Sequence, residues 1–142
     1  MKIILVAILI ISALFAGCVS PENNTLIKKD VILDIEPSNI KVKNGEVKQI
    51  KIRVNNSGES NILALVRFNI NESDRQYLNF TPESYNTGVL RPGEDSGRRN
   101  VDIKAALPAG NNITYLVRVE TVDTNKGVVI DSKDMTITVE RN

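Results

Sequence analysis

The sequence predicts an all-β fold, an antiparallel β-sandwich of about seven strands that follows an N-terminal signal segment. Apolar and polar residues alternate with a period of two over most of residues 31–142, which is the pattern of strands with one buried face. Clusters of Gly, Pro, Asn and Asp separate these segments at short intervals. Helical periodicity is absent from the same region. Together these observations favour a sandwich over a fold in which strands alternate with helices.

The first eighteen residues are typical of a secretory signal. Lys2 supplies a positive charge, residues 3–11 are almost entirely aliphatic, and Ala16 and Gly17 are small residues directly before Cys18. The apolar run is shorter than the ~20 residues that a membrane-spanning helix needs. This favours removal of the segment. The alternatives are an ordinary signal peptide with an incidental cysteine and an uncleaved anchor helix.

The sequence LFAGC at residues 14–18 resembles the lipobox of prokaryotic lipoproteins. The resemblance implies cleavage before Cys18 and attachment of a diacylglyceryl-type lipid to its sulfur, although Phe15 stands where that family usually has Leu. Cys18 is the only cysteine and can form no internal disulfide. We therefore expect residues 1–17 to be a signal peptide, residues 18–30 a lipidated cysteine with a polar tether, and residues 31–142 the domain. The domain would then face outside the cytoplasm, on the cell membrane.

The expected strands begin at Val31. Residues 31–36 and 40–43 alternate on either side of Pro37, and Asn44-Gly45 predicts a two-residue hairpin turn into the next strand, which ends near Val54. Residues 62–70 are expected to form a central strand, because Leu63 and Leu65 make its second face apolar as well.

The second half continues the pattern after a less regular stretch. Residues 71–88 carry little alternation and are expected to be irregular. Further strands are expected at 101–105, 115–119, 128–130 and 135–139. The alternation assigns these residues to the core: Val31, Leu33, Ile35, Ile50, Ile52, Val54, Val66, Phe68, Val101, Ile103, Tyr115, Val117, Val119, Ile137 and Val139.

Tyr115 begins a strand after the turn at Pro108–Gly110, which resembles the tyrosine corner of immunoglobulin-like domains. That resemblance implies a hydrogen bond from the tyrosine hydroxyl to the backbone a few residues upstream. The order of turns around Gly45, Gly58 and Gly93, followed by Tyr115, is similar to CARDB-type, adhesion-related modules of prokaryotic surface proteins. Such modules are usually non-catalytic scaffolds or binding units.

Composition argues against most enzyme chemistry. The chain has no histidine, which excludes imidazole bases, Ser-His-Asp triads and most zinc or copper sites. Removal of residues 1–17 leaves equal numbers of basic and acidic residues, which gives no argument for nucleic acid binding. The segment from Asp123 to Gly127 resembles the start of a calcium loop but lacks its distal Glu, so we interpret it as a hairpin turn. We expect no catalytic residue, cofactor or metal.

Five segments match the N-glycosylation motif Asn-x-Ser/Thr, with Asn23, Asn55, Asn71, Asn79 and Asn112 as the candidate acceptors. A surface rich in Asn, Ser and Thr generates such motifs without modification, so the motif alone leaves both interpretations open.

Two groups of residues are candidates for an interaction surface. Tyr77 and Tyr85 lie in the irregular stretch and are expected at a contact patch. The alternative is that this stretch plugs one end of the sandwich with Leu78 and Phe80. Four basic residues are expected to share the outer face of two neighbouring strands, where they either meet acidic glycans or lipid headgroups or simply face solvent; they are Lys41, Lys43, Lys51 and Arg53.

The most consistent interpretation is a non-catalytic, lipid-anchored surface module whose partner is a surface protein or glycan, or which builds envelope structure. The alternative is a lipoprotein that binds a small ligand or ion for a transporter. An enzyme is disfavoured by the missing histidine.

We expect the mature chain to begin at Cys18 and to partition into detergent, because two acyl chains hold a protein on a membrane firmly. Cys18→Ser should release or misprocess the protein. Intact-mass measurement checks both points, and an unmodified thiol at residue 18 would contradict the anchor.

Overall fold

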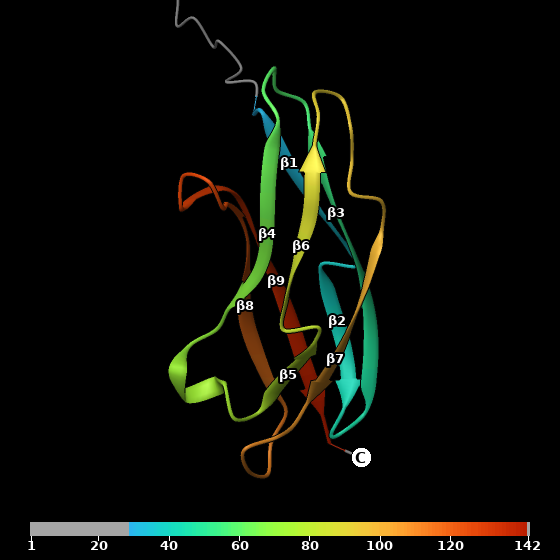
Figure 1. Ribbon diagram of the computed structural model, residues 1–142. Helices are drawn as coiled ribbons and strands as arrows, with labels where there is room; N and C mark the ends of the chain where they lie inside the picture. The colour runs from blue at the N-terminus through green and yellow to red at the C-terminus, as the bar shows by residue number, and fades with distance from the viewer. Residues whose placement is uncertain (1–28, 142) are drawn as a thin grey trace, which may run out of the picture.

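The structure, a computed structural model, describes residues 29–141 (Figure 1). Cys18 and Asn23 therefore lie outside the described residues, as do the segment expected to be a signal and most of the expected tether. In the described part of the chain, no helix has the length and apolar character needed to cross a membrane.

In residues 29–141, nine strands form two packed sheets. The four-stranded sheet has the order β1 (Val31–Glu36), β3 (Val47–Asn56), β7 (Arg99–Ala105) and β5 (Leu78–Thr81). The five-stranded sheet has the order β2 (Asn39–Lys43), β9 (Val128–Glu140), β8 (Ile113–Asp123), β4 (Ile62–Asn69) and β6 (Ser84–Leu90). One short 3-10 helix, η1 (Glu72–Asp74), follows β4. The predicted sandwich is confirmed, and all its strand pairs are antiparallel except that of β2 with β9.

The chain crosses between the sheets at two prolines. The strands that were not expected are β5 and β6, which lie in the stretch predicted to be irregular. The chain leaves the four-stranded sheet after β1 at Pro37 and enters the other as β2. It does the same between β5 and β6 at Pro82. Proline has no backbone N–H and cannot continue a ladder as a donor. Both peptide bonds before these prolines are cis.

The hairpin predicted at Asn44-Gly45 is wrong, although the tight turn exists. Glu46 N–H donates to the carbonyl oxygen of Lys43 at 2.9 Å and closes the turn. However, β2 pairs with β9 and β3 with β1 and β7, so the turn passes from one sheet to the other. Gly45 N–H donates to the Ala105 carbonyl at 2.9 Å, which ties the turn to β7. A turn motif fixes the reversal of the chain but not the partner of the strand that follows.

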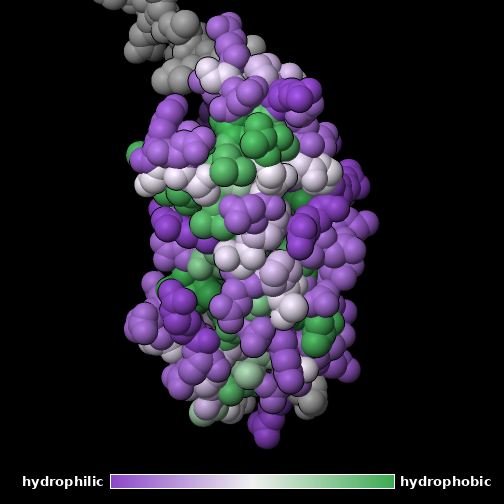
Figure 2. Space-filling view, viewed as in Figure 1, coloured by the Kyte–Doolittle hydropathy of each residue, from purple (hydrophilic) through white to green (hydrophobic). Residues whose placement is uncertain are grey.

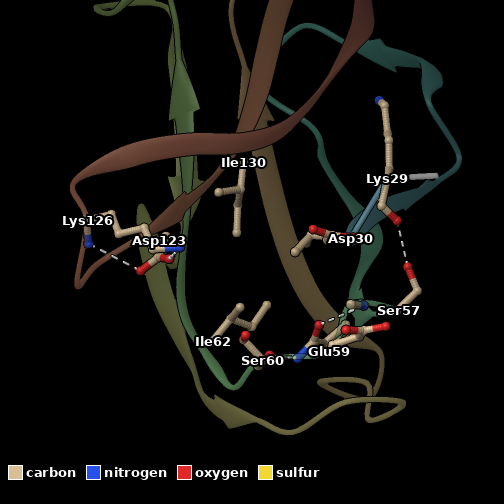
Figure 3. A pocket seen from close by; sticks show the side chains of 12 residues that line it. Lys29, Asp30, Ser57, Glu59, Ser60, Ile62, Asp123, Lys126 and Ile130 are labelled. Carbon is tan, nitrogen blue, oxygen red and sulfur yellow. Dashed lines mark hydrogen bonds and ion pairs between the residues drawn. The ribbon is translucent and has the colours of Figure 1, made fainter. Parts of the chain in front are cut away.

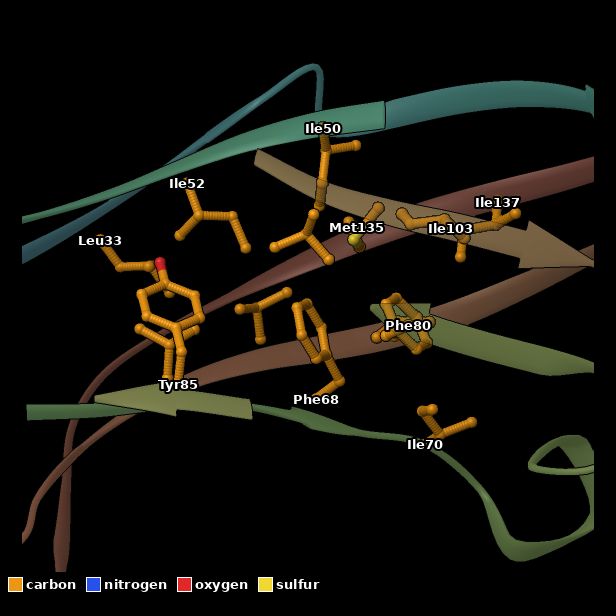
Figure 4. Close-up of a cluster of buried hydrophobic side chains, with 14 of the residues drawn as sticks. Leu33, Ile50, Ile52, Phe68, Ile70, Phe80, Tyr85, Ile103, Met135 and Ile137 are labelled. Atoms are coloured by element: carbon orange, nitrogen blue, oxygen red, sulfur yellow. The ribbon is translucent and has the colours of Figure 1, made fainter. Parts of the chain in front are cut away.

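The core lies between the sheets and contains the residues predicted for it (Figure 4). All of them are buried except Ile35, which is half-buried and packs against the core. The interior position predicted for β4 is confirmed, because it pairs with β6 on one side and β8 on the other. Residues 128–140 form one continuous strand rather than two, with a register shift opposite Thr121/Val122.

The stretch at 71–88 is more ordered than predicted, since it contains β5 and β6. The ring of Phe80 stacks on that of Phe68, with centroids 4.3 Å apart and 14° between the ring planes. Both rings are buried. This segment therefore packs one end of the sandwich instead of forming a free loop.

The tyrosine corner is confirmed. The Tyr115 hydroxyl donates to the carbonyl oxygen of Ala106 at 2.8 Å, and the residue is only 2% exposed. Its ring packs against that of Tyr77, with centroids 6.5 Å apart. This hydrogen bond holds the β7–β8 connection against the start of β8.

Tyr115→Phe should lower the free energy of unfolding by about 0.5–1.5 kcal/mol, because it removes one buried hydrogen bond and leaves the ring in place. The melting temperature should fall by about 2–6 °C. Tyr77→Phe is the matched control, because Tyr77 is only half-buried and its hydroxyl does not close the corner. Equal losses in the two variants would contradict a structural role for the corner.

Candidate functional site

The loops of the sandwich gather at its two ends (Figure 1). At the N-terminal end, the start of β1 lies beside the β3–β4 loop and the β6–β7 loop, with the β8–β9 turn nearby. At the opposite end, here called the distal end, lie the β2–β3 turn, the β4–β5 connection, the β7–β8 loop and the C-terminus.

Asn56 organises the loops at the N-terminal end. Its side chain is fully buried, and its Nδ2 donates to the carbonyl oxygens of Ser60 at 2.8 Å and Leu90 at 2.9 Å. Its Oδ1 accepts the N–H of Gly58 at 3.1 Å. The same residue exchanges backbone hydrogen bonds with the β6–β7 loop, at Gly93 and Glu94. One amide group thus fixes two loops relative to each other.

Asp131 links the two sheets where β1 and β9 lie side by side. Its Oδ2 accepts the N–H of Leu33 at 2.8 Å, and its Oδ1 accepts Lys29 Nζ at 2.8 Å. Burial by itself raises the pKa of this carboxyl. The hydrogen bonds from Lys29, Leu33 and Ser132 outweigh that effect and hold the pKa below its usual value. The carboxylate serves to attach the first described residues to the domain.

An open hollow of about 640 Å³ lies at the N-terminal end (Figure 3). Its lining mixes charged, polar and aliphatic side chains, among them Asp30, Glu59, Lys126 and Ile130. Its buried carboxylate, Asp123, accepts the N–H groups of Asn125 and Lys126 at 2.9 and 3.3 Å, so it shapes the β8–β9 turn. The hairpin interpretation of this turn is confirmed. In residues 29–141, no three His, Cys, Asp or Glu side chains are placed to hold a metal ion.

An apolar patch covers part of the outer face of the five-stranded sheet. Leu63 lies directly opposite Val89, Leu65 opposite Val122, and Val122 opposite Val129, so side chains from four strands are adjacent. Val89 is 61% and Val129 46% exposed, whereas Leu63 and Leu65 are half-buried. Figure 2 shows apolar surface over β4 and β6 near the end at which the described chain begins. We call these five residues the apolar patch.

Ion pairs border the apolar patch on the same sheet face. Arg67 Nε donates to Glu120 Oε2 at 2.8 Å in the next cross-strand row, and Arg118 Nε donates to Asp134 Oδ1 at 2.8 Å beyond it. Burial raises the pKa of Glu120, but hydrogen bonds from Arg67 and Asn69 outweigh it and lower the pKa. The sheet face therefore changes from apolar near the N-terminal end to charged and paired further along.

The predicted basic face does not exist as one surface. Lys41 and Lys43 lie on β2 in the five-stranded sheet, whereas Lys51 and Arg53 lie on β3 in the four-stranded sheet. The prediction failed because it assumed a hairpin at Asn44-Gly45. A hairpin would have placed β2 and β3 side by side in one sheet.

Two of these four basic residues are also paired with carboxylates. Lys41 Nζ is 3.7 Å from Glu140 Oε1, and Arg53 Nη2 donates to Asp34 Oδ2 at 3.0 Å. The hydrogen bond from Arg53 lowers the pKa of Asp34 against the opposing effect of burial, with help from Lys133. Paired charges of this kind are weak attractors for an acidic ligand.

Tyr85 was predicted at a contact surface and is instead in the core, 7% exposed and opposite Val66. Tyr85 is an inward-facing residue of β6. Its burial was not predicted, because residues 71–88 were expected to be irregular. Burial raises the pKa of its hydroxyl to about 12, opposed by the nearby Arg99, whose guanidinium carbon is 4.9 Å from the ring centroid. Tyr77 is half-buried against Tyr115, so the two tyrosines form no joint patch.

The apolar patch was not predicted, although part of its signal was present. In the sequence, Leu63 and Leu65 lie on the outward-facing side of their strand, and this second apolar side predicts a central strand. Val89 and Val129 are distant in sequence, and only the strand order and register bring them beside those leucines.

No protein-family model matches the chain, and no curated protein matches its sequence. Solved structures resemble its fold. Native α-2-macroglobulin from Escherichia coli matches with a TM-score of 0.51 at 15% identity, over 78% of this chain and 16% of that chain. A FixG-related protein from Vibrio parahaemolyticus matches with a TM-score of 0.50 at 8% identity, over 80% of this chain and 97% of that chain.

The CARDB domain of a Pyrococcus furiosus protein, solved in complex with di-metal ions, matches with a TM-score of 0.48 at 16% identity, over 80% of this chain and 88% of that chain. At such identities these likenesses concern the fold alone. The chain has the immunoglobulin-like β-sandwich fold that was expected from its sequence, and the strand order and the tyrosine corner of the structure agree with that class.

Proposed function

We propose that this protein is a non-catalytic, lipid-anchored cell-surface domain that binds a protein partner through the apolar patch. The observation that carries the proposal is the exposure of Val89 and Val129, at 61% and 46%, beside two cross-strand rows of paired charges. One further residue of this face, Leu116, is also exposed, at 56%, and it lies beyond those charged rows. Exposed apolar patches with a polar rim are typical of protein–protein or membrane contacts.

A protein partner fits the patch better than a glycan or a lipid surface. The patch is built from Leu and Val and contains no aromatic ring of the kind that binding surfaces use as anchors for sugars. Surfaces that lie in a membrane interface usually combine apolar residues with Lys and Arg. Here the bordering charges are Arg–carboxylate pairs, at Arg67–Glu120 and Arg118–Asp134, which suit a partner with complementary polar groups.

The anchor rests on the sequence, since Cys18 lies outside the described residues. A lipid there would hold the N-terminal end toward the membrane. Residues 19–28 would separate the two by at most about 35 Å when fully extended. The apolar patch lies toward that end of the domain, which favours a partner close to the membrane surface.

A second candidate function is binding of a small polar ligand in the hollow at the N-terminal end. Its volume of about 640 Å³ lies within the range of small-molecule sites. The polar groups of its lining favour a structural role, because Asn56 and Asp123 already hold loops and Ser57 Oγ donates to the Lys29 carbonyl at 2.7 Å. We therefore rank this function second.

The test uses the anchored protein in intact membranes, crosslinked and then purified with its partners. The double variant Val89→Ser, Val129→Ser should bind its partner about tenfold more weakly, since loss of contact residues at an interface costs roughly 1 kcal/mol or more. Both residues are exposed, so the fold should persist.

Val47→Ser is the matched control, because Val47 is 53% exposed on β3 in the other sheet. It should leave the captured partner unchanged. An unchanged partner in the double variant, or an equal loss with Val47→Ser, would contradict the proposed contact.

A further inference from the structure

The structure separates the N-glycosylation motifs by position. Those at Asn71, Asn79 and Asn112 lie toward the distal end of the sandwich: Asn71 directly precedes η1, Asn79 is in β5, and Asn112 directly precedes β8. In Figure 1 these elements lie at the end opposite the start of β1. The motif at Asn55 lies at the N-terminal end, where β3 finishes.

The three distal motifs are accessible. Both the asparagine and the hydroxyl residue of each one are exposed; the hydroxyl residues are Ser73, Thr81 and Thr114. The Asn71 side chain makes no capping hydrogen bond to η1. Asn112 Oδ1 accepts the N–H of Arg141 at 3.0 Å, and this bond does not involve Nδ2, the atom to which a sugar is attached. Their side chains are therefore open to modification in the folded protein.

The motif at Asn55 is part of the fold instead. Asn55 is half-buried, opposite Ile32 of β1 and bridged to Asp95 of the β6–β7 loop. Asn56 is fully buried, and the Ser57 hydroxyl donates to the Lys29 carbonyl at 2.7 Å. The loop structure explains this Asn-Asn-Ser sequence without any modification.

We infer that Asn71, Asn79 and Asn112 are N-glycosylation sites that together place oligosaccharides around the distal end, and that Asn55 is not a site. The inference rests on the export that the proposed function includes. The sugar donor would be an oligosaccharide linked through phosphate to a membrane lipid. In the transfer, Asn Nδ2 forms a bond to the anomeric carbon, and the bond from that carbon to the phosphate oxygen breaks. The phosphate leaves with the bonding electrons, and the amide nitrogen loses one proton.

This arrangement would give the two ends of the domain different surfaces. Glycans are bulky and solvated, so three of them would shield the distal end from protein contacts. The apolar patch, which lies toward the other end, would remain open to a partner.

The experiment is intact-mass measurement and peptide mapping of the full chain purified from the membranes of its own cells. Sugar masses should be present on the peptides with Asn71, Asn79 and Asn112 and absent from the peptide with Asn55. Each of N71Q, N79Q and N112Q should remove the mass of one oligosaccharide, whereas N55Q should remove none. S73A, T81A and T114A should cause the same losses with the asparagine intact, which identifies the motif as the cause.

Three unmodified distal asparagines on a chain whose Cys18 is processed and lipidated would overturn this inference and leave the proposed function in place. Glycosylation of Asn55 to the same extent as the other sites would contradict the claim that only the exposed motifs are modified. Glycans at the three distal sites, together with unchanged partner binding by the apolar-patch variant, would support the inference while contradicting the proposed contact.

Discussion

The fold depends on two chain segments that cross from one sheet to the other. An open sandwich leaves unpaired backbone groups along its edges, which are sites of uncontrolled strand pairing. Here β1 continues into β2 and β5 into β6, so each crossing segment supplies an edge strand to both sheets. Asp131 of β9 reinforces the first crossing, because its carboxylate accepts the N–H of Leu33 in β1, a strand of the other sheet. Each sheet therefore ends on strands that continue into the other sheet, which ties the two sheets together along both edges.

Two buried polar side chains in this domain hold its loops and strands in place. Asn56 and Asp131 lie within the fold at 0% and 6% exposure, and each satisfies several backbone groups. Removing one hydrogen-bond partner of such a buried group costs about 1–3 kcal/mol. Groups committed in this way are poorly suited to acid–base chemistry, which needs a proton that is readily exchanged. This supports a binding function over a catalytic one.

The sequence predicts the interior of this protein better than its surface. Alternation depends only on the neighbours of each residue, so it identified the buried side of the strands outside residues 71–88. It did not identify β5 and β6, where Tyr85 is buried against expectation. Pairing depends on distant segments. For that reason Asn44-Gly45 was misread as a hairpin, and Lys41 and Arg53 were placed on one face although they lie on opposite sheets. The apolar patch was missed for the same reason, since its four strands meet only through tertiary pairing.

The central claim is that the five-stranded sheet, and not the opposite sheet, contacts a protein partner. The most direct measurement replaces single residues of the full chain with a photoreactive amino acid in its own cells and maps the adducts formed on their intact membranes. Positions 89 and 129 should give the same protein adduct, and position 47, which is similarly exposed on the opposite sheet, should give none. Adducts of equal yield from position 47, or their absence from both positions 89 and 129, would contradict the account.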